Sequence, residues 1–256
     1  MTIREKASPS GVRHSYPAWK ARVDQLQNPY SHYVLAPLAF RLAPIFINCG
    51  VSANTVTGCS LLLLIGGLTL VGFGAVRHAN FLFVAVCLNL VILLDNIDGH
   101  VARFTGHAST FGALFDDLVT WVHFSVLPLC LGVGLFYAPP ESSVLALGIA
   151  FPRGLWITAG VVKMLAYLFS MLVGYKVELL LGAHRYHEGV AQQRGLVLAK
   201  AIREIESPLL VIAAAAGILS FLFISYTVYS VGILVVAIIR ALRETALSDR
   251  ERARQG

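Results

Sequence analysis

The sequence predicts an all-α integral membrane protein with six transmembrane helices preceded by an amphipathic interfacial helix. Its composition is the first observation: 57% of the 256 residues are hydrophobic, 13% are charged, and the mean hydropathy is +0.72. Soluble domains carry about 25% charged residues, so this chain requires an apolar solvent. The second observation is a series of apolar runs, each near the ~20 residues that cross a bilayer as a helix. They cover residues 55–76, 80–102, 112–137, 154–176, 208–223 and 225–243.

The segment 28–47 precedes the first run and is amphipathic. It carries Arg41 and is interrupted by Pro37 and Pro44, so we expect it to lie in the membrane interface. Polar, basic tails occupy 1–27 and 246–256, and the first of these contains no apolar stretch of the kind found in secretory signals. The six-helix domain is expected to run over 48–245.

Basic residues predict the orientation of the helices. With six spans, the clusters of Lys and Arg all fall on one side of the membrane, whereas the opposite loops hold only Arg77 and Arg153. The positive-inside rule makes the rich side cytoplasmic. We therefore expect a multi-pass protein of the bacterial inner (cytoplasmic) membrane, with both termini and the site in the cytoplasm. The net charge of +6 suits membrane lipids with anionic headgroups and gives no reason to expect nucleic acid.

Three carboxylates lie where two apolar runs meet the cytoplasmic side. Asp95 and Asp98 share one helical face, and Asp116 begins the next run from the same side. A carboxylate at the centre of a membrane helix costs about 2.5 kcal/mol or more, and like charges repel. A divalent cation relieves both problems, and carboxylates near water suit Mg²⁺ or Mn²⁺, which commonly bridge to a diphosphate. The alternative is structural: the two α-helical aspartates cap a helix or pair with Arg103.

The spacing resembles the motif D-x-x-D-G-x-x-A-R-x8-G-x-x-x-D-x-x-x-D of the CDP-alcohol phosphotransferases, integral membrane enzymes of phospholipid synthesis. Seven of its eight fixed positions match: Asp95, Asp98, Gly99, Ala102, Arg103, Gly112 and Asp116. The segment SANTVT, 52–57, is also similar to the family's P-N-x-x-T, with Ala53 in place of proline. The resemblance covers about residues 28–245. It implies transfer of a phosphatidyl, or another substituted phosphoryl, group from a CDP-activated lipid donor to an unidentified acceptor, with release of CMP.

The resemblance also implies roles for the residues. Asp95, Asp98 and Asp116 would hold Mg²⁺ or Mn²⁺ on the diphosphate, and Arg103 would order these carboxylates or steady a phosphate. The nucleotide-donor site would include Asn54, Thr57, Gly99, Ala102, Arg103 and Gly112. For Asn54 and Thr57, capping of the following helix is the alternative. A homodimer is a further implication.

The fourth aspartate of the motif falls on Thr120, whose hydroxyl does not ionise near neutrality. In the family this carboxylate is taken as the general base. One substitute is Asp117, also a candidate metal ligand, although it points about 100° round the helix from Asp116. Another is His123, on the same face as Asp116, for which the alternative is a polar residue satisfied between helices. A third solution is an acceptor already ionised at pH 7. In the fourth, the chain only binds nucleotide-activated lipid or a partner.

Other functions fit the pattern less well. Intramembrane prenyltransferases use N-D-x-x-D, but Leu94 precedes Asp95, Thr120 interrupts the second acidic motif, and six spans are too few. A transporter would require internal repeats, which the sequence lacks. Lys163, inside the fourth apolar run, neutralises a phosphate, pairs with a carboxylate or extends its ammonium group to the membrane interface.

Overall fold

The computed structural model describes residues 6–73, 78–138, 151–181 and 194–255, and within these ranges the regular elements are all helices. This confirms the all-α class. The N-terminal part comprises α1 (Pro9–His14), α2 (Ala18–Gln27), the π-helical η1 (Ser31–Leu35) and α3 (Ala36–Asn48). Four long helices follow: α4 (Ala53–Phe73), α5 (His78–Thr105), α6 (Thr110–Tyr137) and α7 (Gly154–Leu181). The last three are α9 (Arg194–Glu204), α10 (Glu206–Ala216) and α11 (Leu219–Gln255).

Five helices in the described ranges are long and apolar enough to cross a membrane: α4, α5, α6, α7 and α11. The prediction of one span over 208–223 is wrong, because α10 ends at Ala216 and α11 begins at Leu219. Gly217 between them has φ +71°, and the following N–H of Ile218 donates to the Ala213 carbonyl (2.9 Å). This turn needs a residue without a Cβ, so the glycine ends the helix.

The two segments predicted as polar, basic tails contain helices. The stretch 1–27 contains α1 and α2, and residues 246–255 continue α11. The predicted interfacial segment is helical. The prediction that prolines interrupt it is wrong. Pro37 lies in the first turn of α3, where its missing N–H is not needed, and Pro44 lies inside the helix near its end. Ala39 and Ala43 of α3 pack in a small core with residues of α1, α4 and α5.

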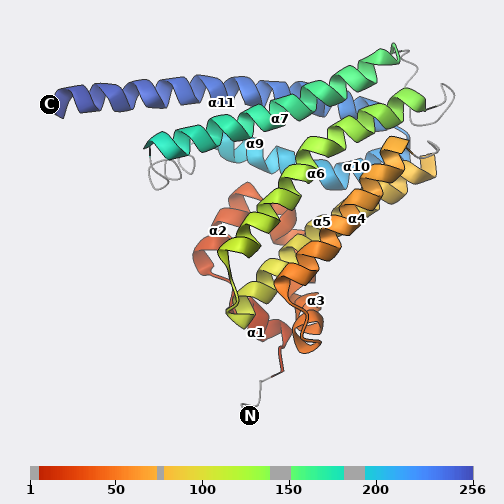
Figure 1. Cartoon of the computed structure of the whole chain (residues 1–256), viewed down its shortest axis with the longest axis vertical. Helices are drawn as coiled ribbons and strands as arrows, with labels where there is room; N and C mark the ends of the chain where they lie inside the picture. The colour runs from red at the N-terminus through yellow and green to blue at the C-terminus, as the bar shows by residue number, and fades with distance from the viewer. Residues whose placement is uncertain (1–5, 74–77, 139–150, 182–193, 256) are drawn as a thin grey trace.

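The helices form two groups, which meet where α6 packs on α7 and where α10 packs on α5 (Figure 1). The helices α4, α5 and α6 run together, and the N-terminal helices α1–α3 lie at the end where α4 begins. In the second group α7 and α11 lie side by side, with α9 and α10 one after the other alongside them. Backbones come close where α6 crosses α7: a Cβ on Gly160 would be 2.6 Å from the Pro128 carbonyl oxygen, and one on Gly132 would overlap the Trp156 carbonyl.

Hydrogen bonds join the C-terminal helices to the rest of the chain. The Glu204 carboxylate at the end of α9 accepts the N–H groups of Tyr30 (3.1 Å) and Ser31 (2.9 Å). Asn89 of α5 accepts from the Tyr30 hydroxyl (2.8 Å) and donates to the Ser207 carbonyl (2.9 Å). The start of α10 is thereby held beside the middle of α5.

Candidate functional site

The turn between α5 and α6 brings the predicted carboxylates together. Asp95 and Asp98 lie one turn apart on α5, and Asp116 lies on the second turn of α6. The carboxyl groups of Asp95 and Asp116 are within hydrogen-bonding reach, and Asp98 is within electrostatic range of both. The turn depends on Gly106, with φ +70°, and on Ser109, whose hydroxyl accepts the Gly112 N–H (3.0 Å) at the start of α6.

A third helix reaches the cluster through Thr57. Asp98 is only 5% exposed, and its Oδ2 accepts a hydrogen bond from the Thr57 hydroxyl of α4 at 2.5 Å. The capping alternative for Asn54 and Thr57 is wrong, because Ser52 caps α4: its hydroxyl accepts the Thr55 N–H (3.2 Å). Thr57 therefore orients a carboxylate, while Asn54 is exposed at the helix start.

The two motif glycines each make room for a polar side chain. A Cβ on Gly99 would lie 3.0 Å from the Arg103 guanidinium, and one on Gly112 would lie 2.9 Å from Asn54 Oδ1. At such distances a methyl group fits only if the Arg103 or Asn54 side chain shifts. Ala102, one turn beyond Asp98, is partly buried, and its carbonyl accepts the His107 N–H (3.1 Å) that ends α5. The glycines thus let Arg103 and Asn54 approach the acidic cluster.

Arg103 does not pair with the aspartates, so this part of the structural alternative is wrong. Its Nη2 lies 3.1 Å from Nδ1 of His100, and its guanidinium carbon lies 5.5 Å from the centroid of the Tyr16 ring. Its Nε is buried and has no hydrogen-bond partner among the described residues. Asp98 and Asp116 are still within its electrostatic range. The guanidinium therefore retains a donor for another acceptor.

The N-terminal helices supply neighbours that the sequence analysis missed. The Tyr16 ring, between α1 and α2, contacts His100 edge-on at 5.3 Å, and its hydroxyl donates to Asp24. Burial and the neighbouring Asp24 raise the pKa of the Tyr16 phenol. Lys20 of α2 is within electrostatic range of Asp95. The spacing of Lys20 and Asp24, four residues apart, is the signal that could have identified an ordered helix here.

The residues considered as substitutes for the fourth aspartate lie in different surroundings. Thr120 is partly buried, and Asp117 is exposed beside Asp116, on another face of α6. His123 is 3% exposed and stacks on Phe124 with ring centroids 4.8 Å apart. Seven helical residues from Asp116 correspond to about 10 Å along the axis. The charged neighbour of His123 is Lys163 of α7.

Lys163 pairs with a carboxylate, which was one of its three predicted roles. Its partner, Glu206, is the first residue of α10, and both side chains are buried. The ammonium also lies 5.4 Å from the centroid of the Tyr226 ring and 5.9 Å from that of Phe223. The Lys163 ammonium therefore contacts Glu206 of α10 and two aromatic rings of α11. It is also the positive charge near His123.

The donor set suits a hard divalent cation, although no three His, Cys, Asp or Glu side chains in the described ranges already form a metal-ion site. The oxygens of Asp95, Asp98 and Asp116 are the ligand type that Mg²⁺ and Mn²⁺ prefer. Oδ1 of Asp116 is buried with no hydrogen-bond partner in the described part of the chain. Such an oxygen is expected to have a partner, so it is the best candidate ligand.

No protein-family model and no curated protein matches this chain. The motif residues and their arrangement are therefore the basis for assigning a function.

Proposed function

We propose that the protein is a membrane transferase of phospholipid synthesis that moves a phosphatidyl, or another substituted phosphoryl, group from a CDP-alcohol to an acceptor and releases CMP. The observation that carries the proposal is the convergence of Asp95, Asp98 and Asp116 from two apolar helices, at the spacing of the CDP-alcohol phosphotransferase motif. Carboxylates within apolar helices are costly, so such a cluster favours a functional role over a structural one.

In this proposal the chain's residues bind and orient the donor. Asp95, Asp98 and Asp116 hold Mg²⁺ or Mn²⁺, and the Thr57 hydroxyl fixes the direction of the Asp98 carboxylate. The metal ion, when bound, supplies charge stabilisation on the diphosphate oxygens. Arg103 has a free Nε–H that can donate to a phosphate oxygen, a charge-assisted bond. Asn54, with its amide beside Gly112, is placed to contact the nucleotide.

Thr120 supports one competing proposal, that the protein binds a nucleotide-activated lipid without transferring it. No group that ionises near neutrality occupies this position, and His123 lies deep among α6, α7 and their aromatic residues. Transfer to an acceptor that is already ionised would not require a base. The two proposals therefore differ in whether turnover occurs and with which acceptor.

The finer location of the protein is proposed on the same grounds. We place it in the bacterial inner membrane as a homodimer, with the acidic cluster and both termini facing the cytoplasm. The support is the charge asymmetry of the loops and the family resemblance.

The test is CMP release by the full-length protein in nanodiscs with CDP-diacylglycerol and Mg²⁺. The acceptor panel includes hydroxyl, amine and phosphate compounds. The variants are Asp98→Asn, Thr120→Asp and His123→Ala, with Asp249→Asn as a control that removes an exposed carboxylate from α11. We expect release that requires one acceptor, is lost in Asp98→Asn and is unchanged in Asp249→Asn.

The His123→Ala and Thr120→Asp variants test which residue acts as the base and whether the natural protein turns over its donor. Loss of activity in His123→Ala, with folding retained, would identify the histidine as the base. Turnover by Thr120→Asp alone would favour the binding protein. If no variant releases CMP from any CDP-alcohol, while each still folds, the transferase proposal is wrong.

A further inference from the structure

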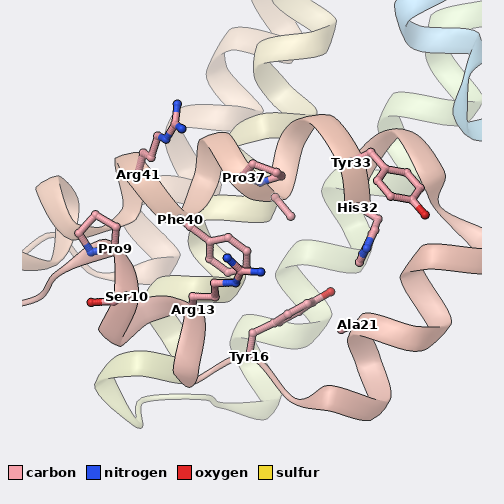
Figure 2. A pocket seen from close by; sticks show the side chains of 11 residues that line it. Pro9, Ser10, Arg13, Tyr16, Ala21, His32, Tyr33, Pro37, Phe40 and Arg41 are labelled. Atoms are coloured by element: carbon pink, nitrogen blue, oxygen red, sulfur yellow. The ribbon is translucent and has the colours of Figure 1, made fainter.

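A cavity of about 680 Å³ lies between α1, α2 and the η1–α3 segment, and it is separate from the aspartate cluster (Figure 2). Its volume is in the range of about 300–1,000 Å³ that holds small-molecule ligands. The apolar part of its lining includes Pro37 and Phe40 of α3. Its cationic or potentially cationic residues are Arg13, His32 and Arg41, one from each of three elements. The cavity is therefore positive and partly apolar.

The polar groups of the cavity have unused hydrogen-bonding capacity. Nδ1 of His32 is buried without a hydrogen-bond partner in the described part of the chain. Figure 2 shows the His32 ring and the Tyr16 ring pointing toward one another across the cavity. Arg13 is exposed in the last turn of α1, and none of the described lining residues is Asp or Glu. The described lining residues thus supply no negative charge themselves, and the Asp24 carboxylate beside Tyr16 accepts the hydroxyl of that residue.

The basic and apolar residues that line the cavity indicate which kind of ligand fits it. A guanidinium group presents a planar fork of donors that matches phosphate oxygens, and imidazole adds a further donor or acceptor. The prolines and Phe40 provide an apolar wall for the part of the ligand attached to the phosphate. Tyr16, a lining residue, also contacts the Arg103 guanidinium, whose electrostatic neighbours include Asp98 and Asp116.

We propose that this cavity is a second ligand site, which binds a phosphate group outside the aspartate cluster. Arg13 attracts and holds the phosphate, Arg41 adds positive charge at the rim, and His32 completes the hydrogen bonds of the phosphate. Two sources can supply this group: a soluble phosphomonoester and the headgroup of an anionic phospholipid. The proposal concerns binding and does not require the transferase activity.

The experiment measures binding to the full-length protein in phosphatidylcholine nanodiscs. EDTA is present, so that binding through a divalent cation is excluded. The soluble probe is sn-glycerol 3-phosphate, titrated by calorimetry. The lipid probe is phosphatidic acid, added to the nanodiscs and detected as protein-bound lipid by native mass spectrometry. Arg13→Gln is compared with Arg22→Gln, which removes the same charge from an exposed position of α2 outside the cavity.

We expect saturable binding of one probe by wild type and Arg22→Gln, and a dissociation constant at least about tenfold higher in Arg13→Gln, because a charge-assisted hydrogen bond is lost. Saturation by the soluble probe identifies a phosphomonoester as the source. Binding of the lipid probe alone identifies a headgroup. Equal effects of the two variants, or no saturable binding of either probe, would overturn the proposal.

A further variant separates this proposal from the transferase. Asp98→Asn removes a carboxylate of the acidic cluster and leaves the cavity intact, so it should abolish CMP release while probe binding is retained. If Asp98→Asn also abolishes probe binding, the phosphate lies at the aspartate cluster and the second site is wrong. If wild type binds the probe and releases no CMP, only the transferase fails.

Discussion

At the scale of single residues, the acidic cluster is defined by what each carboxylate contacts. Asp98 accepts from Thr57, Asp95 and Asp116 lie against each other, and Oδ1 of Asp116 is buried without a partner in the described structure. Three similar side chains thus have three different environments. The residue that orients the cluster, Thr57, is a neutral side chain from a third helix, so its removal tests the geometry without altering the charge.

Thr57→Val removes the hydroxyl and nearly preserves the shape of the side chain. The buried Asp98 carboxylate then loses the Thr57 donor and keeps the backbone hydrogen bond from Gly99, and the loss costs about 1–3 kcal/mol. We expect a lower Tm and at least a tenfold slower release of CMP. Thr57→Ser keeps the hydroxyl and is expected to retain most of the activity. Equal activity of the valine and serine variants would show that the hydrogen bond does not orient the site.

Gly112→Ala tests whether Asn54 has to remain beside the start of α6. The new methyl group would lie 2.9 Å from Asn54 Oδ1 and 3.1 Å from Ser109 Oγ, so the amide has to move, whereas the exposed Ser109 hydroxyl needs to shift only slightly. We expect CMP release to fall at least tenfold while the Tm changes little, since Asn54 is exposed. The control is Gly66→Ala in α4, where nothing lies within 4 Å of the new methyl group. That change favours the helix by up to about 1 kcal/mol and should leave activity intact.

The sequence predicted the acidic cluster well because helical spacing alone places Asp95 above Asp98. It could not predict that Thr57 faces Asp98, since these residues are 41 positions apart and packing decides their contact. Tyr16 was missed for a related reason. Its neighbours Arg103 and His100 belong to a distant helix, and α1, of six residues, is too short to show a clear apolar period.

At the scale of elements, the backbones of α6 and α7 pack closely where the two helices cross. Gly132 of α6 lies against the backbone of α7, and Gly160 of α7 lies against the backbone of α6. A methyl group on either glycine would meet a carbonyl oxygen of the other helix. Apolar periodicity predicted both helices, but it does not specify which faces meet. A small residue at a crossing is a recurrent solution between membrane helices, because association there depends on close packing.

Gly132→Ala is expected to destabilise this crossing. Its methyl group would overlap the Trp156 carbonyl, a backbone atom that can move only with α7. Overpacking of this kind costs about 1–3 kcal/mol. The measurement is the Tm in detergent compared with Gly66→Ala, which we expect to be unchanged or higher. A Tm for Gly132→Ala equal to that of wild type would mean that α6 and α7 do not approach so closely.

At the scale of the whole molecule, the helix end at Gly217 determines which helices make the last two crossings of the membrane. The helix α10 has 11 residues, about 16 Å, and cannot cross a core of about 30 Å alone. The helix α9 precedes it with only Ile205 between them, and the Tyr226 hydroxyl of α11 donates to the Ile202 carbonyl (3.0 Å). Thus α11 runs back along α10 and α9, as Figure 1 shows. Of α9 and α10, hydropathy identified only the apolar helix α10.

We therefore expect α9 and α10 to complete one crossing together and α11 to make the return. The measurement is labelling of single introduced cysteines with a membrane-impermeant maleimide, in a chain whose four natural cysteines are replaced. His107→Cys, Phe151→Cys, Ala216→Cys and Arg250→Cys each place the thiol at an exposed position. Positions 151 and 216 should label from one face of the membrane, and positions 107 and 250 from the other. The reason is that α6 crosses between 107 and 151, that α7 and the α9–α10 pair cross between 151 and 216, and that α11 crosses between 216 and 250. If position 216 labels with 107, then α10 turns back within the near half of the membrane, and the C-terminus lies opposite the N-terminal helices.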